Sequence, residues 1–306
     1  MKQTILFFIS FLLFTACVGS EGGSDAAADY NDSAKVRIAV MPTLDCLPLY
    51  VASERGFFAS AGIDVSLRPY QAQMDCDTAL ERGRVNAIVT DMVRARKLEE
   101  KGIGLQVVTA TNASWQLVSS KAARIKQLKQ LDDKMVAMTR FSATHMLGDL
   151  IVDTARLQPE RVFRIQINDV GVRLSMLYNN TMDAAFLPEP QATVARNMGG
   201  WVLWDSNTAG WQFGIVGFRP QVATEKQKAA FCEAYDRACD SINERGMGYY
   251  ASLIVRHCGV TQNAVDSLPD VTFRHCQEPR EADRKRVSEW MDRNKKTEVA
   301  NERASR

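Results

Sequence analysis

The chain has 306 residues, with 38 Lys and Arg against 36 Asp and Glu and a formal net charge of +2 at pH 7. So nearly neutral a chain gives no reason to expect nucleic acid as a partner, and its length accommodates two domains of ordinary size. Beyond the N-terminal residues, no apolar stretch approaches the ~20 residues that a membrane-spanning helix needs.

Residues 1–16 have the pattern of a secretory signal peptide. Lys2 precedes a short apolar run and small residues, and the run is too short to remain as a membrane anchor. The Thr-Ala-Cys ending at Cys17 is similar to a bacterial lipobox, which implies lipidation of Cys17; the alternative is an ordinary signal with a chance cysteine. Residues 17–34, rich in Gly, Ser, Ala and Asp, predict a flexible tether. We therefore expect an exported lipoprotein, periplasmic or at the cell surface.

Strands and helices alternate through the first half of the chain. The apolar patterns predict strands at 35–40, 63–68, 85–89 and 105–110, with helices at 49–55, 76–83 and 92–101. Such alternation is typical of a mostly parallel sheet with helices on both faces.

The same order then restarts. Strands are expected at 134–138, 162–167, 182–187 and 202–204, with helices from 142 and at 171–179. A strand at 213–218 should return to the first unit, followed by helices at 225–244, 249–258 and 280–295 and a fraying end. The repeat predicts two similar α/β units.

Two such units joined by short crossings predict a two-lobed clamp. We expect residues 35–118 and 214–306 to form lobe one, which is discontinuous, and residues 119–213 to form lobe two. The crossings near 117–121 and 213–218 should act as hinges. Because ligands of open α/β sheets bind beyond the carboxyl ends of the strands, a ligand cleft is expected between the lobes.

Four stretches carry a resemblance to a known family. They read LYVASERGFF from Leu49, AGIDV from Ala61, FSATH from Phe141 and MDAAFLPEP from Met182. Their order and spacing, over roughly residues 35–245, resemble type II periplasmic binding proteins of ABC transporters, the group that includes binders of aliphatic sulfonates, taurine, nitrate and thiamine pyrimidines. The resemblance implies a clamp that captures a small solute, with an ABC permease as partner; we expect a monomer.

The turn before the helix at 142 is the sharpest candidate for ligand contact. Small residues there leave backbone N–H groups free, and the helix N-terminus adds about half a positive charge. This suits a carboxylate, phosphate or sulfonate, or the electron-rich edge of a ring. The alternative is that Ser142 only caps the helix. The candidate residues are Ser142, Ala143, Thr144 and His145.

Three loops of lobe one supply polar candidates. They are Thr43, Leu44 and Asp45 after the first strand, Gln73 and Asp75 after the second, and Thr90 and Asp91 after the third. Three carboxylates and few cations favour a ligand with amine or N–H donors. The alternative is that these are solvated loop acids.

Further candidates lie near the predicted crossings. Trp115, after Ser114, and Trp211 offer flat aromatic surfaces for stacking on a heterocycle, or else pack at the hinge. Glu189 stands between two prolines at the end of a strand. It lines the pocket in the resembled family; the alternative is a rigid turn.

Six cysteines follow Cys17: Cys46, Cys76, Cys232, Cys239, Cys258 and Cys276. Export permits disulfides. Cys232 and Cys239 lie on one predicted helix with Cα atoms about 10.5 Å apart, beyond the ~7 Å limit for a bridge. If both are oxidised, each must reach Cys258 or Cys276, and the two N-terminal cysteines then pair. The alternative is a set of buried free thiols.

The sequence therefore predicts the extracytoplasmic solute-binding component of an ABC importer, with a small polar ligand, an amine-bearing heterocycle being favoured. No zinc spacing, Walker loop, HExxH motif or Ser-His-Asp order is present, so we expect no metal, no cofactor and no catalysis. One alternative is a ligand-sensing lipoprotein that signals to a protein partner. The other is an enzyme of pyrimidine or menaquinone biosynthesis with the same fold.

Overall fold

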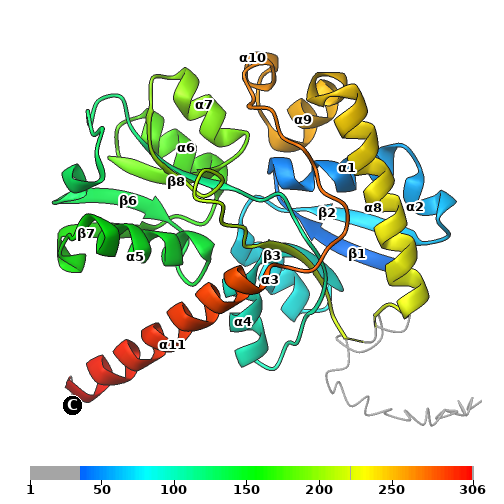
Figure 1. The fold of residues 1–306 in the computed structure, drawn as a ribbon, viewed down its shortest axis with the longest axis horizontal. Helices are drawn as coiled ribbons and strands as arrows, with labels where there is room; N and C mark the ends of the chain where they lie inside the picture. The colour runs from blue at the N-terminus through cyan, green and yellow to red at the C-terminus, as the bar shows by residue number, and fades with distance from the viewer. Residues whose placement is uncertain (1–34, 221, 305–306) are drawn as a thin grey trace, which may run out of the picture.

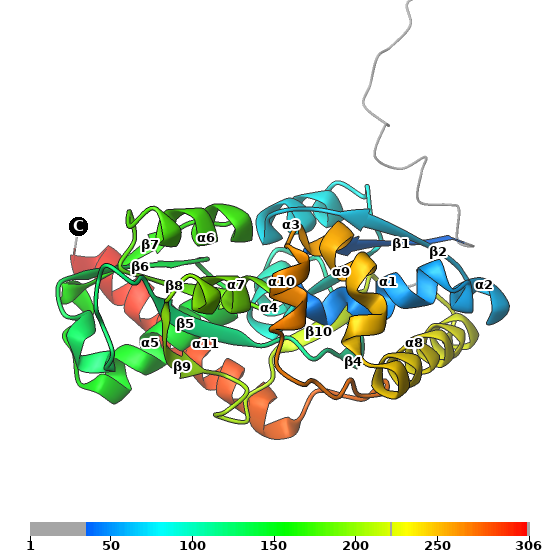
Figure 2. The same ribbon diagram turned by 90° about the horizontal axis from the view of Figure 1, so that it is seen from above.

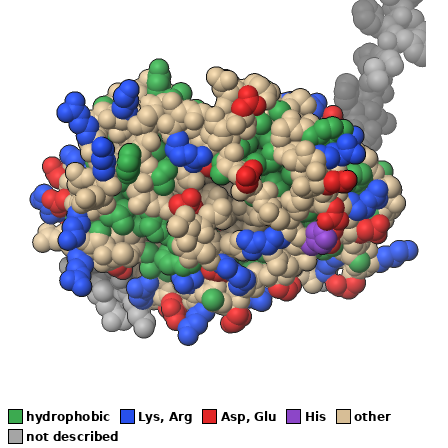
Figure 3. Space-filling model, turned by 45° about the horizontal axis from the view of Figure 1, so that its top comes forward, with side chains coloured by type: hydrophobic (Ala, Val, Ile, Leu, Met, Phe, Trp, Pro, Cys, Tyr) green, Lys and Arg blue, Asp and Glu red, His purple; other side chains and the backbone are tan. Residues whose placement is uncertain are grey.

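The computed structural model describes residues 35–220 and 222–304, so the predicted signal peptide and the whole predicted tether, Cys17 included, lie outside the described residues. The chain folds into two lobes, each built on one five-stranded sheet with flanking helices (Figure 1). None of the described helices combines the length and apolar character that crossing a membrane requires. Acidic and basic side chains are interspersed on the face drawn in Figure 3, in keeping with the small net charge.

The sheet of lobe one has the order β2-β1-β3-β10-β4. Its strands are β1 (Lys35–Val40), β2 (Asp64–Pro69), β3 (Ala87–Asp91), β4 (Gln106–Ala110) and β10 (Gly214–Phe218). β1 pairs in parallel with β2 and β3, whereas β10 runs antiparallel between β3 and β4. β3 and β10 are buried along their whole length because they lie inside the sheet.

The sheet of lobe two repeats this plan in the order β7-β6-β8-β5-β9. Its strands are β5 (Trp115–Ser119), β6 (Lys134–Met138), β7 (Val162–Gln166), β8 (Ala184–Pro188) and β9 (Trp201–Asp205). β5 runs antiparallel between β8 and β9. Each sheet thus receives its antiparallel inner strand just after the chain leaves the other lobe.

Helices cover both sheets (Figures 1 and 2). They are α1 (Leu47–Glu54), α2 (Phe57–Ser60), α3 (Gln73–Glu81), α4 (Met92–Glu100), α5 (Ala143–Ala155), α6 (Val170–Tyr178), α7 (Gln191–Asn197), α8 (Glu225–Arg245), α9 (Ala251–Cys258), α10 (Gln262–Asp266) and α11 (Glu281–Ala304). Within the described residues, 3-10 turns lie at Leu44–Cys46, Leu128–Leu131, Pro159–Arg161 and Met247–Tyr250.

The segments that join the lobes differ from the predicted hinges. Residues 117–121 fall mostly within β5 and residues 213–218 mostly within β10, and both strands are hydrogen-bonded on two sides, which makes them rigid. The irregular segments between the sheets are residues 111–114 and 206–213. The crossings therefore lie a few residues away from their predicted positions, and the hinge motion itself stays a prediction. The exact lobe boundaries stay a prediction.

Helix α11 touches both lobes, although the sequence assigned it to lobe one. It packs against α4 of lobe one. The indole Nε1 of buried Trp290 donates to Asp149 Oδ2 of α5 in lobe two at 2.9 Å. The helix continues to Ala304 where a fraying end was expected.

The six described cysteines are free thiols in the structure. The neighbouring Cys276 side chain lowers the pKa of the Cys232 thiol, while Cys239 Sγ donates to the carbonyl of Arg274 at 3.3 Å. Cys46 and Cys76 are fully buried. The disulfide pairings stay predictions.

Candidate functional site

A small cavity of about 60 Å³ lies between the two lobes and will be called the inner cavity. Eight residues proposed from the sequence line it: Thr43, Asp45, Gln73, Thr90, Asp91, Trp115, Ser142 and Thr144. Most of them lie at or just beyond the carboxyl ends of β1, β3 and β6, where parallel strands of the two sheets face one another. Because a single water needs roughly 10–15 Å³ of such volume, the inner cavity as it stands holds only a very small molecule.

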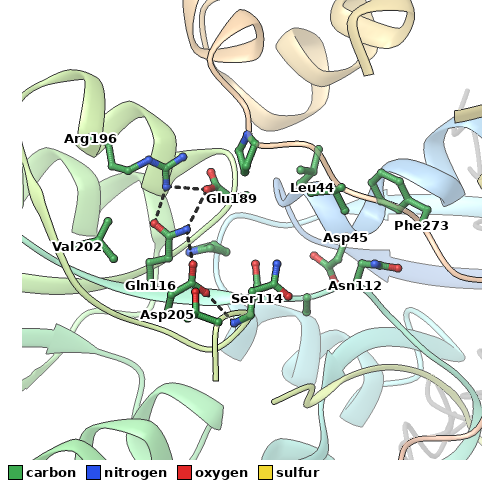
Figure 4. Close-up of a pocket in the computed structure, with 16 residues that line it drawn as sticks. Leu44, Asp45, Asn112, Ser114, Gln116, Glu189, Arg196, Val202, Asp205 and Phe273 are labelled. Carbon is green, nitrogen blue, oxygen red and sulfur yellow. Dashed lines mark hydrogen bonds and ion pairs between the residues drawn. The ribbon is translucent and has the colours of Figure 1, made fainter. Parts of the chain in front are cut away.

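A larger cavity of about 570 Å³, the outer cavity, adjoins the inner one (Figure 4). The two share Asp45, Ala113 and Pro188. Three more sequence candidates line the outer cavity, namely Leu44, Ser114 and Glu189. The extended segment that follows α10 contributes Phe273 to its wall. A ligand larger than the inner cavity therefore has room to extend outward.

Two charged side chains of the outer cavity, Glu189 and Arg196, pair with each other. Glu189 accepts hydrogen bonds from the backbone N–H and hydroxyl of Thr193 at 3.0 and 2.7 Å and from Arg196 Nη1 at 2.8 Å. Gln116 Nε2 donates to Glu189 at 3.3 Å and to Asp205 at 3.1 Å, as the dashed lines of Figure 4 mark. The Glu189 carboxylate thus accepts its hydrogen bonds from α7 and from other residues of its own lobe.

Asp45 sits where the two cavities meet and is buried. Its Oδ1 accepts from the hydroxyl of Thr43 at 2.6 Å and its Oδ2 from the hydroxyl of Thr111 at 3.0 Å. Burial raises the pKa of Asp45, and the two hydroxyls oppose that rise. Within the described residues it forms no ion pair. Asp45 is therefore a carboxylate held by neutral donors alone.

Asp91 has a structural role in addition to its place in the inner cavity. Its Oδ1 accepts from the N–H groups of Val93 and Arg94, both at 3.0 Å, and so caps α4. The N–H of Ala143, in lobe two, also favours its charged form. Burial is the larger effect and raises the pKa of Asp91 to about 6. Backbone donors therefore already occupy much of this carboxylate.

The side chains in the turn before α5 also already form hydrogen bonds within the protein. Ser142 Oγ accepts from the N–H of Thr144 at 3.2 Å and donates to the carbonyl of Thr139 at 2.7 Å. Thr144 Oγ1 accepts from the N–H of Thr139 at 3.0 Å. The two readings of Ser142 are thus compatible, because the side chain caps the helix and also lines the inner cavity.

Arg173 is a wall residue of the inner cavity that the sequence analysis missed. It lies in the first turn of α6 and only 4% of it is exposed. Its Nη1 donates to the carbonyl of Phe186 at 2.7 Å. Burial lowers its pKa to about 10, with Asp169 opposing the shift, so it stays charged at neutral pH. The signal was its spacing from Val170 and Leu177, which puts a cation on the buried face of a helix.

Two of the sequence candidates have side chains outside both cavities. Asp75 is exposed in the first turn of α3, and the Ala143 side chain is fully buried in a hydrophobic cluster to which both lobes contribute. Neither lines the inner or the outer cavity. A loop assignment from sequence therefore did not settle which way each side chain points.

Two aromatic candidates pack away from both cavities. His145 lies edge-on to Trp290 with ring centroids 5.2 Å apart. Trp211 packs against Trp204 with centroids 5.3 Å apart and lies 4.3 Å beneath the guanidinium of Arg286. For Trp211 the geometry corresponds to packing beside the crossing, which was the alternative considered for it.

The part of the chain that the structure describes holds no group of three or more His, Cys, Asp or Glu side chains arranged to hold a metal ion.

Comparisons with known proteins converge on one fold. The family described as NMT1/THI5 like matches residues 43–199. No curated protein matches the sequence.

Solved structures match over most of the chain. A ligand-binding component of an ABC-type import system from Staphylococcus aureus, solved with zinc bound, is 14% identical, with a TM-score of 0.72, covering 85% of this chain and 91% of that one. The periplasmic aliphatic sulphonate-binding protein of Escherichia coli is also 14% identical, with a TM-score of 0.71, covering 86% and 88%. The periplasmic nitrate-binding protein of Synechocystis is 15% identical, with a TM-score of 0.67, covering 80% and 74%. These likenesses confirm the predicted two-lobed fold of periplasmic binding proteins.

Proposed function

The chain belongs to the NMT1/THI5-like family, and on that premise we propose that it is the extracytoplasmic solute-binding component of an ABC importer. It captures a small polar molecule between its lobes and presents the closed complex to a membrane permease. In this proposal Cys17 carries a lipid anchor and the protein acts as a monomer. The observation that supports capture best is a cavity at the facing carboxyl ends of two sheets, lined by buried polar side chains from both lobes.

Direct contacts between the lobes support a closing motion. The N–H of Leu44 in lobe one donates to the carbonyl of Glu189 in lobe two at 2.8 Å. Gln191 Nε2 of lobe two donates to the carbonyl of Pro42 at 2.7 Å. A ligand that touches both walls adds its own contacts to these and shifts the population toward the closed state. The crossings at 111–114 and 206–213 are the segments that would bend.

An amine-bearing heterocycle remains the favoured ligand of this proposal, on narrower grounds than the sequence offered. Of the three acidic candidates, Asp75 is exposed and Asp91 caps a helix, which leaves Asp45 as the carboxylate best able to accept from a ligand. Trp115 supplies an aromatic wall to the same cavity. A ligand with N–H donors and a flat ring would use both.

A thermal-shift screen of the chain from residue 17, carrying Cys17→Ser, tests the proposal. The panel contains aminopyrimidines, thiamine fragments, flavins, sulfonates, taurine and nitrate. A ligand at 100 times its Kd should stabilise the protein by about 2.7 kcal/mol, and Asp45→Asn should reduce the shift. If only sulfonates bind, the proposal that the protein captures a small solute stands, but the proposal that the ligand carries an amine is wrong. A folded protein that no panel member stabilises would contradict the proposal.

A further inference from the structure

The segment that joins α10 to α11 crosses lobe one without forming a helix or a strand (Figure 2). We call residues 268–280 the strap. It contributes three side chains to the wall of the outer cavity, those of Pro269, Val271 and Phe273. The N–H of Arg274 donates to Asn112 Oδ1 of the first crossing at 3.1 Å, and Arg274 Nη1 donates to Gln212 of the second. The strap therefore borders both the outer cavity and the segments that join the lobes.

Helix α8 holds the strap through contacts along one of its faces. Asn243 exchanges two hydrogen bonds with the backbone of Phe273, both at 2.8 Å. Cys239 Sγ donates to the next carbonyl of the strap at 3.3 Å, and one turn earlier Asp236 Oδ1 accepts from the N–H of Cys276 at 2.6 Å. The strap thus runs beside α8 in the opposite direction to it (Figure 1).

Cys232 is the next position on this face of α8. It lies four residues before Asp236, and side chains four residues apart on a helix are about 5–6 Å apart at Cβ. Because Asp236 holds the backbone of Cys276, the register brings the two thiols to the same turn of the helix. Both are half-buried and pack against the core of lobe one. In keeping with this, the Cys276 side chain lowers the pKa of Cys232, and Cys232 together with burial raises the pKa of Cys276.

We propose that Cys232 and Cys276 form a disulfide in the exported chain and that this bond fastens the strap to α8. The inference goes beyond the proposed function and takes from it only export, because disulfides persist in extracytoplasmic compartments. Cys239 also faces the strap, but its side chain is fully buried and already donates to a carbonyl.

Thiol–disulfide exchange accounts for the atoms and electrons of the step. The Cys232 thiol loses its proton, and the thiolate attacks an oxidant of the disulfide class, from which one sulfur leaves as a thiolate. The Cys276 thiol then loses its proton, and its sulfur attacks Cys232 Sγ of the mixed disulfide and expels the second thiolate. Two electrons and two protons thus pass from the cysteine pair to the oxidant, which becomes two thiols.

Peptide mapping tests the pairing in the chain from residue 17 with Cys17→Ser. The folded protein is equilibrated with oxidised glutathione, free thiols are blocked with N-ethylmaleimide, and the denatured chain is cut with trypsin without reductant. Cleavage after Lys and Arg places Cys232 in the peptide 229–237 and Cys276 in the peptide 275–280, each without a second cysteine. These two peptides should be joined, and a reductant should separate them. Separate peptides, or a link of either one to a different cysteine, would overturn the proposal.

Thermal unfolding tests the fastening. The bond closes a long loop in the unfolded chain, so the oxidised protein should have a Tm about 5 °C or more above that of the reduced protein. Cys232→Ser and Cys276→Ser should each abolish this difference, whereas the matched control Cys239→Ser, on the same face of α8, should retain it. Each variant is compared with itself in the two redox states, so a general loss of stability cancels. The same Tm in both states of the parent chain would contradict the fastening, and should a variant not fold, the parent chain still decides.

The outcomes are independent of the ligand screen. If the pair joins while no panel member binds, this inference stands and capture is wrong. If a ligand binds while the pair stays reduced, capture stands and the disulfide is wrong. In cells that produce the full chain, thiols blocked at harvest should reveal the same link, and deletion of residues 2–16 should abolish it. Free thiols in the full chain from cells would contradict the bond in the exported protein.

Discussion

The inner and outer cavities share a boundary, yet they treat their charges in opposite ways. In the outer cavity Arg196 is held by Gln116 and Glu189, and the acid in turn is held by Thr193. In the inner cavity neither Arg173 nor Asp45 forms an ion pair within the described residues, although Asp169 favours the charged form of Arg173. The difference teaches that Glu189 and Arg196 stabilise lobe two, whereas Arg173 and Asp45 are available to a ligand.

The largest effect on stability is expected from breaking the outer network. Arg196→Met leaves the buried carboxylate of Glu189 without its cation and should lower the free energy of unfolding by about 3 kcal/mol. Arg173→Met should change it by less than about 1 kcal/mol, because it replaces an unpaired buried cation with an apolar chain. Urea unfolding at pH 7 measures both. Equal losses in the two variants would remove the distinction between the cavities.

Asp91 sharpens the comparison, since it is an inner-cavity acid with a structural task. Burial raises its pKa to about 6 from an ordinary value of 3.8, so the folded chain binds more protons than the unfolded chain between these values. Its contribution to stability therefore declines as the pH rises through that window, and the full cost, about 3 kcal/mol, is present above pH 6.

Asp91→Asn keeps a capping oxygen and removes the titration. Compared with the parent chain, the variant should gain about 2 kcal/mol in the free energy of unfolding between pH 4 and pH 7. Denaturant unfolding across that range measures the gain, and any constant offset from altered hydrogen bonds cancels. Parallel pH profiles would show that Asp91 does not titrate as its burial requires.

The smallest effect concerns the crossing that borders both cavities. A Cβ at Gly214 would overlap the hydroxyl of Thr111 and the side chain of Ala113. Because Thr111 holds Asp45, Gly214→Ala should cost about 1 to 2 kcal/mol of stability and also weaken ligand binding. Gly248→Ala is the control, since its added Cβ meets nothing within 4 Å. Unchanged ligand affinity in Gly214→Ala would show that this crossing does not influence the binding site.

Much of this architecture was predictable, because sheet strands and helix starts leave local patterns. The repeat of strand and helix predicted two lobes, and the rule that ligands bind at strand ends placed Thr43, Thr90 and Ser142 at one cavity. The resemblance to type II periplasmic binding proteins is confirmed by the family and the solved structures.

What the sequence could not provide is side-chain direction. Trp211 follows a crossing, as expected, but its ring turns toward Trp204. Asp91 was assigned to ligand contact, yet an Asp directly before a helix is also a preferred N-cap, and that bond is made. Arg173 lies inside a helix, where a search limited to loops does not reach.

The late position of β10 in the chain sets an order in which the two sheets can be completed. Every strand of the second sheet lies within the continuous stretch from residue 115 to 205, whereas the first sheet lacks an inner strand until β10 has been made. During synthesis the second lobe therefore has all its sheet partners before the first lobe does. A nascent chain that ends before residue 214 leaves the edges of β3 and β4 open, and that is the stage at which a chaperone has most to cover.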